Sequence, residues 1–348
     1  MKLRTGDRVE IKSKEEILRT LDKKGQLEGM PFMPQMFQFC GQRFKIYKRA
    51  HKSCDTVNPI RGMSVPDAVH LDLRCDGEAY GGCQAACLLF WKTAWLKPVN
   101  ETGRTAERVL ETGRLDKDSA TNTASCTEAD VWAARYAEEG QGTVDGPRYR
   151  CQATQLPSFS TYLPWWDFRQ YIEDYTSGNE TFGQLLRGLI YASYASAVQA
   201  GIGLGPFLRW LYDTFQSMWG GLPYPRKSGT IPIGQSTPTS ILDLQQGELV
   251  RVKSHKEILA TLDKNSRNRG LMFDGEMMPY CGGTYRVRTR LYKCIDEKTG
   301  KMTIMKNPVI ILDGVWCRAR YSWCRMFCPR SIYPWWRETW LERMPEDS

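Results

Sequence analysis

The chain repeats part of its own sequence. Residues 5–41 and residues 246–282 align without a gap and are identical at 16 of 37 positions. Such self-similarity is typical of a duplicated structural unit, so it constrains the fold more than any single motif does. We predict two homologous modules, residues 1–99 and 245–348. The modules either fold as separate units or form a pseudo-two-fold pair that shares one interface.

Both modules begin with the same local pattern. A short strand is expected at Val9–Lys12 and at Leu249–Lys253. A serine then occupies the position of a helix N-cap, with a glutamate three residues later. In that arrangement two side chains satisfy two backbone donors at the start of a helix, so one or two helical turns should follow. The serine–glutamate pairs are Ser13 with Glu16 and Ser254 with Glu257.

Strict alternation of apolar and polar residues then predicts a half-buried strand in each module. In the second module the apolar face is formed by Tyr285, Val287, Thr289 and Leu291, and the basic face by Arg286, Arg288 and Arg290. In the first module Phe44 and Ile46 lie opposite Lys45 and Arg49. Further strands of the second module are expected at Lys301–Met305 and Val309–Leu312.

Several short strands with tight turns, after a start of glycine, an acidic residue and valine, resemble small barrels of the Src-homology type. The resemblance covers only the strands of each module and is an analogy at the level of the fold. It implies an α+β fold in which two small β-barrel-like modules with cysteine metal sites flank a mostly helical middle region.

The middle of the chain differs from both modules. Residues 100–162 form a polar connection, residues 163–219 an aromatic and apolar helical region, and residues 220–244 a Gly/Pro linker. Residues Gly188–Leu208 carry no charge, but their glycines and polar residues argue against a membrane-spanning helix. We expect a buried or interfacial helical hairpin, with an irregular linker as the alternative. An interfacial hairpin would bring residues 182–219 into peripheral contact with a membrane.

Twelve cysteines give the chain its clearest chemical signal. Four recur in each module, and the last three are spaced Cys-x7-Cys-x3-Cys in the first copy and Cys-x6-Cys-x3-Cys in the second. The predicted metal ligands are Cys40, Cys75, Cys83 and Cys87, then Cys281, Cys317, Cys324 and Cys328. Four thiolates favour tetrahedral zinc in a structural role, at about two ions per chain. An iron–sulfur cluster and buried thiols without metal are the alternatives.

The other cysteines leave more possibilities open. Cys54 and Cys294 recur beside a lysine, which lowers the pKa of a thiol, although a half-buried strand thiol is the simpler interpretation. Cys126 and Cys151 occur only in the first half of the chain. They would either complete another metal site with His51 and Cys54 or form a redox pair.

The net charge of +9 and the pI of about 8.9 favour anionic partners. The predicted contacts to an acidic protein or polyanion are Lys45, Arg49, Arg286, Arg288 and Arg290. A solvated basic face without a specific partner is the alternative. The N-terminus has no apolar stretch of the kind that a secretory signal needs, so we expect a cytoplasmic protein with reduced cysteines.

As a whole, the chain resembles a type of bacterial protein built from two such cysteine modules, a resemblance that implies no activity. The sequence contains no P-loop, nucleophile-elbow or His-Glu-x-x-His motif. The first hypothesis is a zinc-binding accessory or scaffolding factor. The second is a metal-dependent or redox enzyme with a pocket between the modules and the middle region, formed by Trp165, Trp166, His51, Cys126 and Cys151. The third is a peripheral membrane accessory protein.

Overall fold

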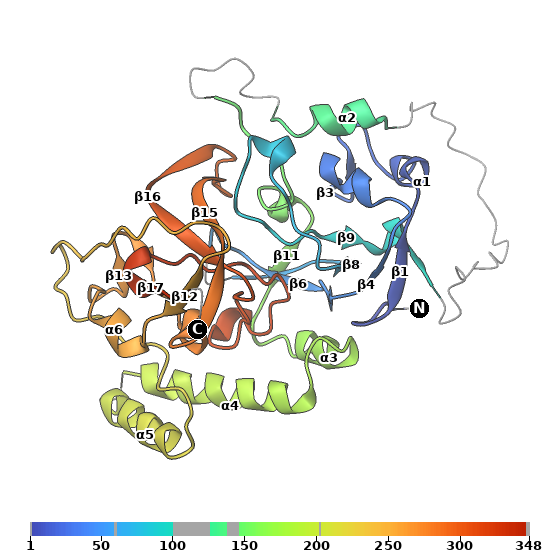
Figure 1. The fold of residues 1–348 in the computed structure, drawn as a ribbon. Coiled ribbons are helices and arrows are strands. Elements are labelled where there is room, and N and C mark those ends of the chain that lie inside the picture. The colour runs from blue at the N-terminus through green and yellow to red at the C-terminus, as the bar shows by residue number, and fades with distance from the viewer. Residues whose placement is uncertain (1, 59–60, 100–125, 138–145, 202, 346–348) are drawn as a thin grey trace.

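The computed structural model describes residues 2–58, 61–99, 126–137, 146–201 and 203–345. It shows an α+β fold made of many small sheets and a half-barrel. Two β-rich bodies lie side by side, and the helices between residues 169 and 218 lie along one side of them (Figure 1). Most of the predicted polar connection lies outside the described residues.

The first body consists of short elements joined by turns. Its helix and strands are β1 (Arg8–Ile11), α1 (Lys14–Leu18), β2 (Gln26–Leu27), β3 (Met30–Pro31), β4 (Arg43–Lys45), β5 (Lys48–Arg49), β6 (Lys52–Cys54), β7 (Gly62–Ser64), β8 (Ala68–His70), β9 (Trp91–Lys92) and β10 (Leu96–Pro98). The middle region contributes α2 (Glu128–Ala133), β11 (Thr161–Leu163), α3 (Arg169–Thr176), α4 (Phe182–Gln199) and α5 (Gly205–Met218). The second body contains β12 (Leu249–Val252), α6 (His255–Leu259), β13 (Arg267–Asn268), β14 (Leu271–Met272), β15 (Thr284–Ile295), β16 (Met302–Leu312) and β17 (Leu341–Arg343).

Each body has a central strand with neighbours in the same order. β1 lies between β10 and β4, and β12 lies between β17 and β15, all antiparallel. The first strand is predicted correctly in both bodies. Both predicted capping boxes are also confirmed: the Ser13 and Ser254 side chains each accept from the backbone N–H of the glutamate at 3.3 Å.

The two cores contain the same aromatic arrangement. In each core a fully buried tryptophan packs edge-on against a phenylalanine ring, and its indole N–H donates to a threonine hydroxyl. The matching residues are Trp95, Phe32 and Thr20 in the first core and Trp340, Phe273 and Thr261 in the second. The two hydrogen bonds measure 3.1 Å and 2.9 Å.

The second body departs from the prediction at its longest hairpin. The strands expected at Lys301–Met305 and Val309–Leu312 are one continuous strand, β16, which pairs with β15 through two register shifts. The shifts let one long strand bend, which a pattern of alternating residues does not reveal. The predicted linker, residues 220–244, packs on the second body, because Leu244 is buried in the second core and Ile231 forms a β-bridge with Asp263.

The middle region is helical from Arg169 onward, as predicted for residues 163–219. α4 and α5 form a hairpin, and α4 packs through Leu185 and Gly188 on Met326 and Phe327 of the second body. Within the described ranges, no helix is both long enough and apolar enough to cross a membrane.

Replacing Thr20 or Thr261 with valine tests the matched cores. Each change leaves a buried indole N–H without its acceptor, so each should lower the free energy of unfolding by about 1–3 kcal/mol. Chemical denaturation measures the loss. The control is Thr214→Val, because Thr214 is exposed and bonds only to a helical carbonyl, and it should change stability by less than roughly 0.5 kcal/mol. Equal effects in all three variants would contradict the prediction.

Candidate functional site

The structure brings the predicted metal-binding cysteines together in other sets than their spacing in the sequence predicts. In the first body, Cys75, Cys83 and Cys87 lie around one small cavity with Cys151, which comes from the middle region. Cys40 is separate: the charged groups that act on its thiol are Lys14 and Glu15, not another cysteine.

The second group of cysteines also takes a member from elsewhere. Cys54 of the first body lies among Cys317, Cys324 and Cys328 and interacts electrostatically with each of them. Cys281 instead packs against the core of the second body. Across the described part of the chain, no group of three or more Cys, His, Asp or Glu side chains is arranged to hold a metal ion. Zinc and an iron–sulfur cluster therefore stay predictions.

A cleft of about 670 Å³ separates the two bodies where these cysteines lie. The first body contributes Cys54 and Cys87 to its wall, and the second contributes Cys294, Cys317 and Cys328. The rest of the lining combines apolar residues with charged ones, which are Asp274, Glu276, Asp296, Glu297, Lys298, Arg325 and Arg330. Clefts of this size are typical of small-molecule sites.

Cys54 and Cys328 form a buried thiol pair across this cleft. The backbone N–H of Cys54 donates to Cys328 Sγ at 3.1 Å, and the two thiols hydrogen-bond to each other. None of the twelve cysteines, all of which lie in described segments, is in a disulfide. The pair is 274 residues apart in sequence, so spacing gave no signal for it.

Two arginines surround the thiol pair. Arg330 is buried, and it donates to the Cys54 carbonyl at 3.2 Å and to Glu297 Oε1 at 2.8 Å. The hydrogen bond from Cys328, and then the positive charges of Arg330 and Arg325, lower the pKa of the Cys54 thiol against the opposing effect of burial. The same hydrogen bond and burial raise the pKa of Cys328.

The residues expected to form an enzyme pocket do not converge. His51 Nε2 lies 3.2 Å from Asp174, in a buried site that also holds Lys52. Cys126 is part of the first core, next to α2. Trp165 and Trp166 are exposed. Only Cys151 reaches another cysteine group, the one that contains Cys75.

The predicted basic face is largely neutralised within the chain. Arg288 pairs with Asp313 at 2.9 Å, and Arg290 pairs with Glu338 at 3.1 Å. Arg49 is buried and pairs with α3 through Glu173 at 2.6 Å. Arg286 donates to the Gly247 carbonyl, and Lys45 is exposed on β4. An acidic partner of this face therefore stays a prediction.

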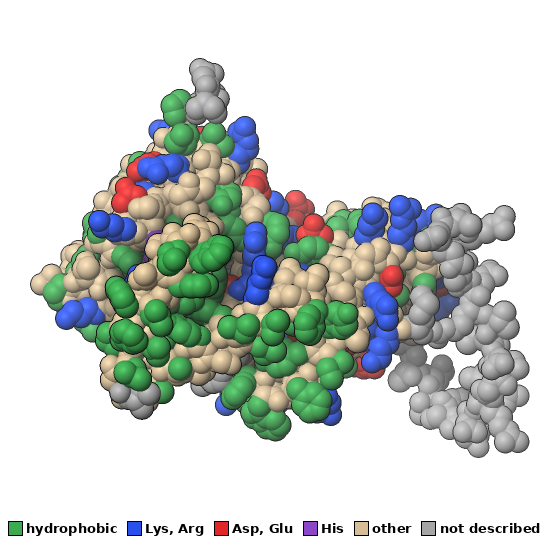
Figure 2. Space-filling view, turned by 90° about the horizontal axis from the view of Figure 1, so that it is seen from below, with side chains coloured by type: hydrophobic (Ala, Val, Ile, Leu, Met, Phe, Trp, Pro, Cys, Tyr) green, Lys and Arg blue, Asp and Glu red, His purple; other side chains and the backbone are tan. Residues whose placement is uncertain are grey.

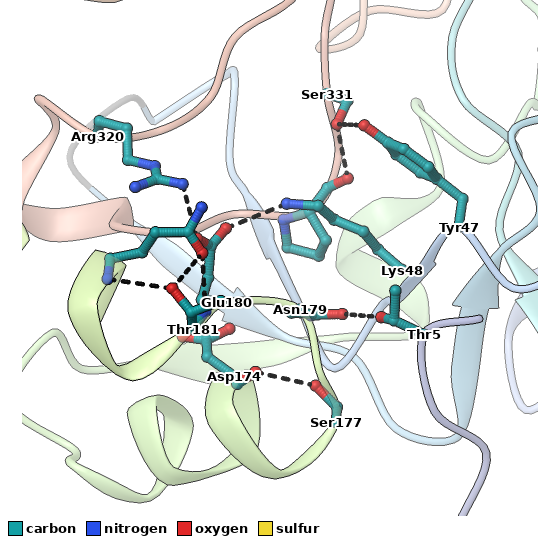
Figure 3. A network of polar contacts seen from close by, with 12 residues as sticks. Thr5, Tyr47, Lys48, Asp174, Ser177, Asn179, Glu180, Thr181, Arg320 and Ser331 are labelled. Carbon is teal, nitrogen blue, oxygen red and sulfur yellow. Dashed lines mark hydrogen bonds and ion pairs between the residues drawn. The ribbon is translucent and has the colours of Figure 1, made fainter. Parts of the chain in front are cut away.

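The turn between α3 and α4 connects both bodies (Figure 3). The buried carboxylate of Glu180 accepts from Lys48 of the first body at 3.2 Å and from Arg320 of the second at 2.7 Å. Next to it, the Asn179 side chain bonds to both backbone groups of Arg49 at 2.8 Å. We call Asn179 and Glu180 the inter-body clamp.

The α4–α5 hairpin leaves its apolar side chains in solvent. The exposed residues are Phe182, Leu186, Leu189, Ile190, Leu204, Phe207, Trp210, Leu211, Phe215, Met218 and Trp219, each at least 42% exposed. We call them the apolar hairpin surface, and Figure 2 shows apolar side chains gathered on this side of the molecule. Trp165, Trp166 and Phe168, just before α3, are exposed as well. Monomeric proteins rarely expose an apolar patch of this extent without a binding role.

Glu180→Gln tests the inter-body clamp. The change removes the only charge in the clamp and leaves two cations around a buried amide, so the free energy of unfolding should fall by about 2–4 kcal/mol. The loss should stay below that of a fully buried pair because Lys48 and Arg320 are 20% and 28% exposed. Glu10→Gln, which breaks a more exposed pair with Arg43, should cost less than about 1 kcal/mol in the same denaturation experiment.

The buried Glu276 predicts a pH dependence of stability. Burial raises its pKa from an ordinary 4.5 to about 7, although backbone N–H groups of Arg320 and Tyr321 donate to it. A carboxyl group with a raised pKa stabilises the fold fully below pH 4.5, and this contribution is lost as the pH rises through 7. The loss should be about 3 kcal/mol and should disappear in Glu276→Gln. An unchanged slope of unfolding free energy against pH in the variant would contradict this assignment.

Comparison with known proteins identifies no relative: no protein-family model matches the chain, and no curated protein is significantly similar to it. A function for this protein must therefore be inferred from the clefts and surfaces of its structure.

Proposed function

We propose that this protein binds peripherally to membranes, with the apolar hairpin surface inserted into one leaflet and the two β-rich bodies in water. The observation that carries the proposal is the exposure of large apolar residues along both helices of the hairpin. Phe182 is 68% exposed, Trp210 60% and Trp219 76%. Lipid insertion would remove this area from water, which is the dominant favourable term in such binding.

The chemistry of the hairpin suits a lipid interface. Its tryptophans have an apolar ring and an N–H group, the combination that is enriched where hydrocarbon meets water. Asp213 is the only acidic residue between positions 182 and 219, and Lys227 pairs with it. Arg187 and Arg209 add positive charge at either end of the uncharged segment. Anionic headgroups would be attracted by these arginines and by the net charge of +9.

Insertion should be shallow. α4 has 18 residues and packs through one stripe on the second body, while no residue of α5 is buried. An apolar groove between the two helices, next to Tyr191 and Tyr212, gives an acyl chain further area to contact. The hairpin therefore suits the boundary between headgroups and acyl chains.

The remaining parts of the proposal concern compartment and architecture. We place the protein in the cytoplasm, where the thiol pool keeps cysteines reduced and the membrane surface carries anionic lipid. We also infer that residues 1–99 and 245–348 are copies of one module. The identical positions, the shared strand order and the matched tryptophan–threonine bonds support that inference. Zinc-dependent scaffolding for an acidic partner stays a prediction.

Vesicle co-sedimentation tests membrane binding. The full chain should sediment with vesicles of phosphatidylcholine and phosphatidylglycerol, and salt should weaken the binding. Replacing Phe207, Trp210 and Phe215 with serine should weaken it at least about 100-fold, since burying each large side chain contributes roughly 1.5–3 kcal/mol.

The matched control replaces three exposed apolar residues away from the hairpin with serine: Ile241 of the linker and Tyr292 and Ile304 of the second body. This variant should bind vesicles like the unchanged protein. If it loses binding equally, or if the unchanged protein ignores vesicles, the proposal is wrong. A stable dimer in solution that the hairpin variant abolishes would also overturn it, because the surface would then be a protein interface.

A further inference from the structure

The thiol pair in the cleft is independent of membrane binding. Its two cysteines come from different bodies, Cys54 from the end of β6 and Cys328 from the loop after the 3-10 helix Trp323–Arg325. Both side chains line the cleft, and they are only 8% and 5% exposed. A small molecule in the cleft would reach them, whereas a folded protein surface would not.

We propose that Cys54 and Cys328 form a redox-active dithiol that reduces a low-molecular-weight disulfide bound in the cleft between the two bodies. The contact between the backbone N–H of Cys54 and Cys328 Sγ, together with the bond between the thiols, already brings the two side chains together. The volume of the cleft, about 670 Å³, is in the range for small-molecule ligands.

The surroundings assign a different role to each thiol. The attacking group in disulfide exchange is a thiolate, which positive charge and hydrogen bonds stabilise. Arg330 donates to the Cys54 carbonyl at 3.2 Å, and Arg325 lines the same cleft, so cations lie next to Cys54. We therefore assign the attack to Cys54 and the resolving step to Cys328.

The exchange balances without another reactant. The Cys54 thiolate attacks one sulfur of the disulfide R–S–S–R, forms a mixed disulfide and releases RS⁻, which takes up a proton. Cys328 then loses its proton and attacks Cys54 Sγ, which releases the second RS⁻. The protein dithiol loses two electrons and becomes a disulfide, and the small molecule gains them and becomes two thiols.

Other cysteines of the same cleft provide an internal comparison. Cys294 lies in the cleft wall at the position that corresponds to Cys54 in the repeat, but burial raises its pKa to about 12. Burial likewise raises the pKa of Cys87. Exposure to the cleft alone thus does not distinguish Cys54 from these thiols. What distinguishes Cys54 is the presence of the neighbouring arginines and of the Cys328 thiol.

The experiment uses the full chain, reduced and then freed of reductant under anaerobic conditions. Glutathione disulfide is the probe. The expected result is release of two molecules of glutathione per chain, as the exchange above requires, and a peptide cross-link between Cys54 and Cys328 in mass spectrometry without reduction.

Three variants test the role of each cysteine. The reaction of Cys328→Ser should stop at a mixed disulfide on Cys54, and Cys54→Ser should form no adduct at position 328. Cys294→Ser, from the same cleft, should cross-link like the unchanged protein.

Two outcomes would overturn the proposal. One is a chain that stays reduced at saturating glutathione disulfide while circular dichroism shows the native fold, or that cross-links through other cysteines. The other is tightly bound metal in the isolated protein that is lost in both Cys54→Ser and Cys328→Ser, because the pair would then be metal ligands. Neither result bears on vesicle binding, and failure of vesicle binding leaves this proposal standing.

Discussion

The buried carboxylate of Glu180 is the contact on which the rest of the arrangement depends. It accepts from Lys48 in one body and from Arg320 in the other, and it immediately precedes the N-cap of α4. One side chain therefore contacts three parts of the molecule. A buried carboxylate is costly to desolvate, so its net contribution to stability is smaller than its contacts suggest. Its main effect is specificity, since a different relation of the bodies would leave this charge without partners.

The cleft exists because that relation is fixed. Cys54 and Cys328 meet only when the two bodies are held side by side, and Arg330 of the second body donates to the Cys54 carbonyl across the same boundary. Cys54 and Cys294 both line that cleft, but their surroundings give their thiols opposite shifts in pKa. Local charge therefore makes two thiols of one cleft different.

Sequence reasoning succeeded where the determinants are local. The capping boxes at Ser13 and Ser254, the first strand of each module and the helices after Arg169 all follow from spacing over a few residues. It missed what depends on distant segments. Cys151 and Cys54 take the places expected for Cys40 and Cys281 in the two cysteine groups, and no spacing between residues this far apart could show it. The arginines of β15 looked available for a partner because Asp313 and Glu338, which pair with them, are remote in sequence.

Gly188 has a mechanical consequence. A Cβ atom at this position would lie 2.3 Å from Phe327 Cζ, so only glycine lets α4 rest directly on the loop that carries Cys328. Phe327, which directly precedes Cys328, thus packs against the α4 backbone with no other side chain between them. Close-packed interiors transmit strain instead of absorbing it. Any side chain larger than hydrogen at position 188 would therefore displace either α4 or the loop that carries Cys328.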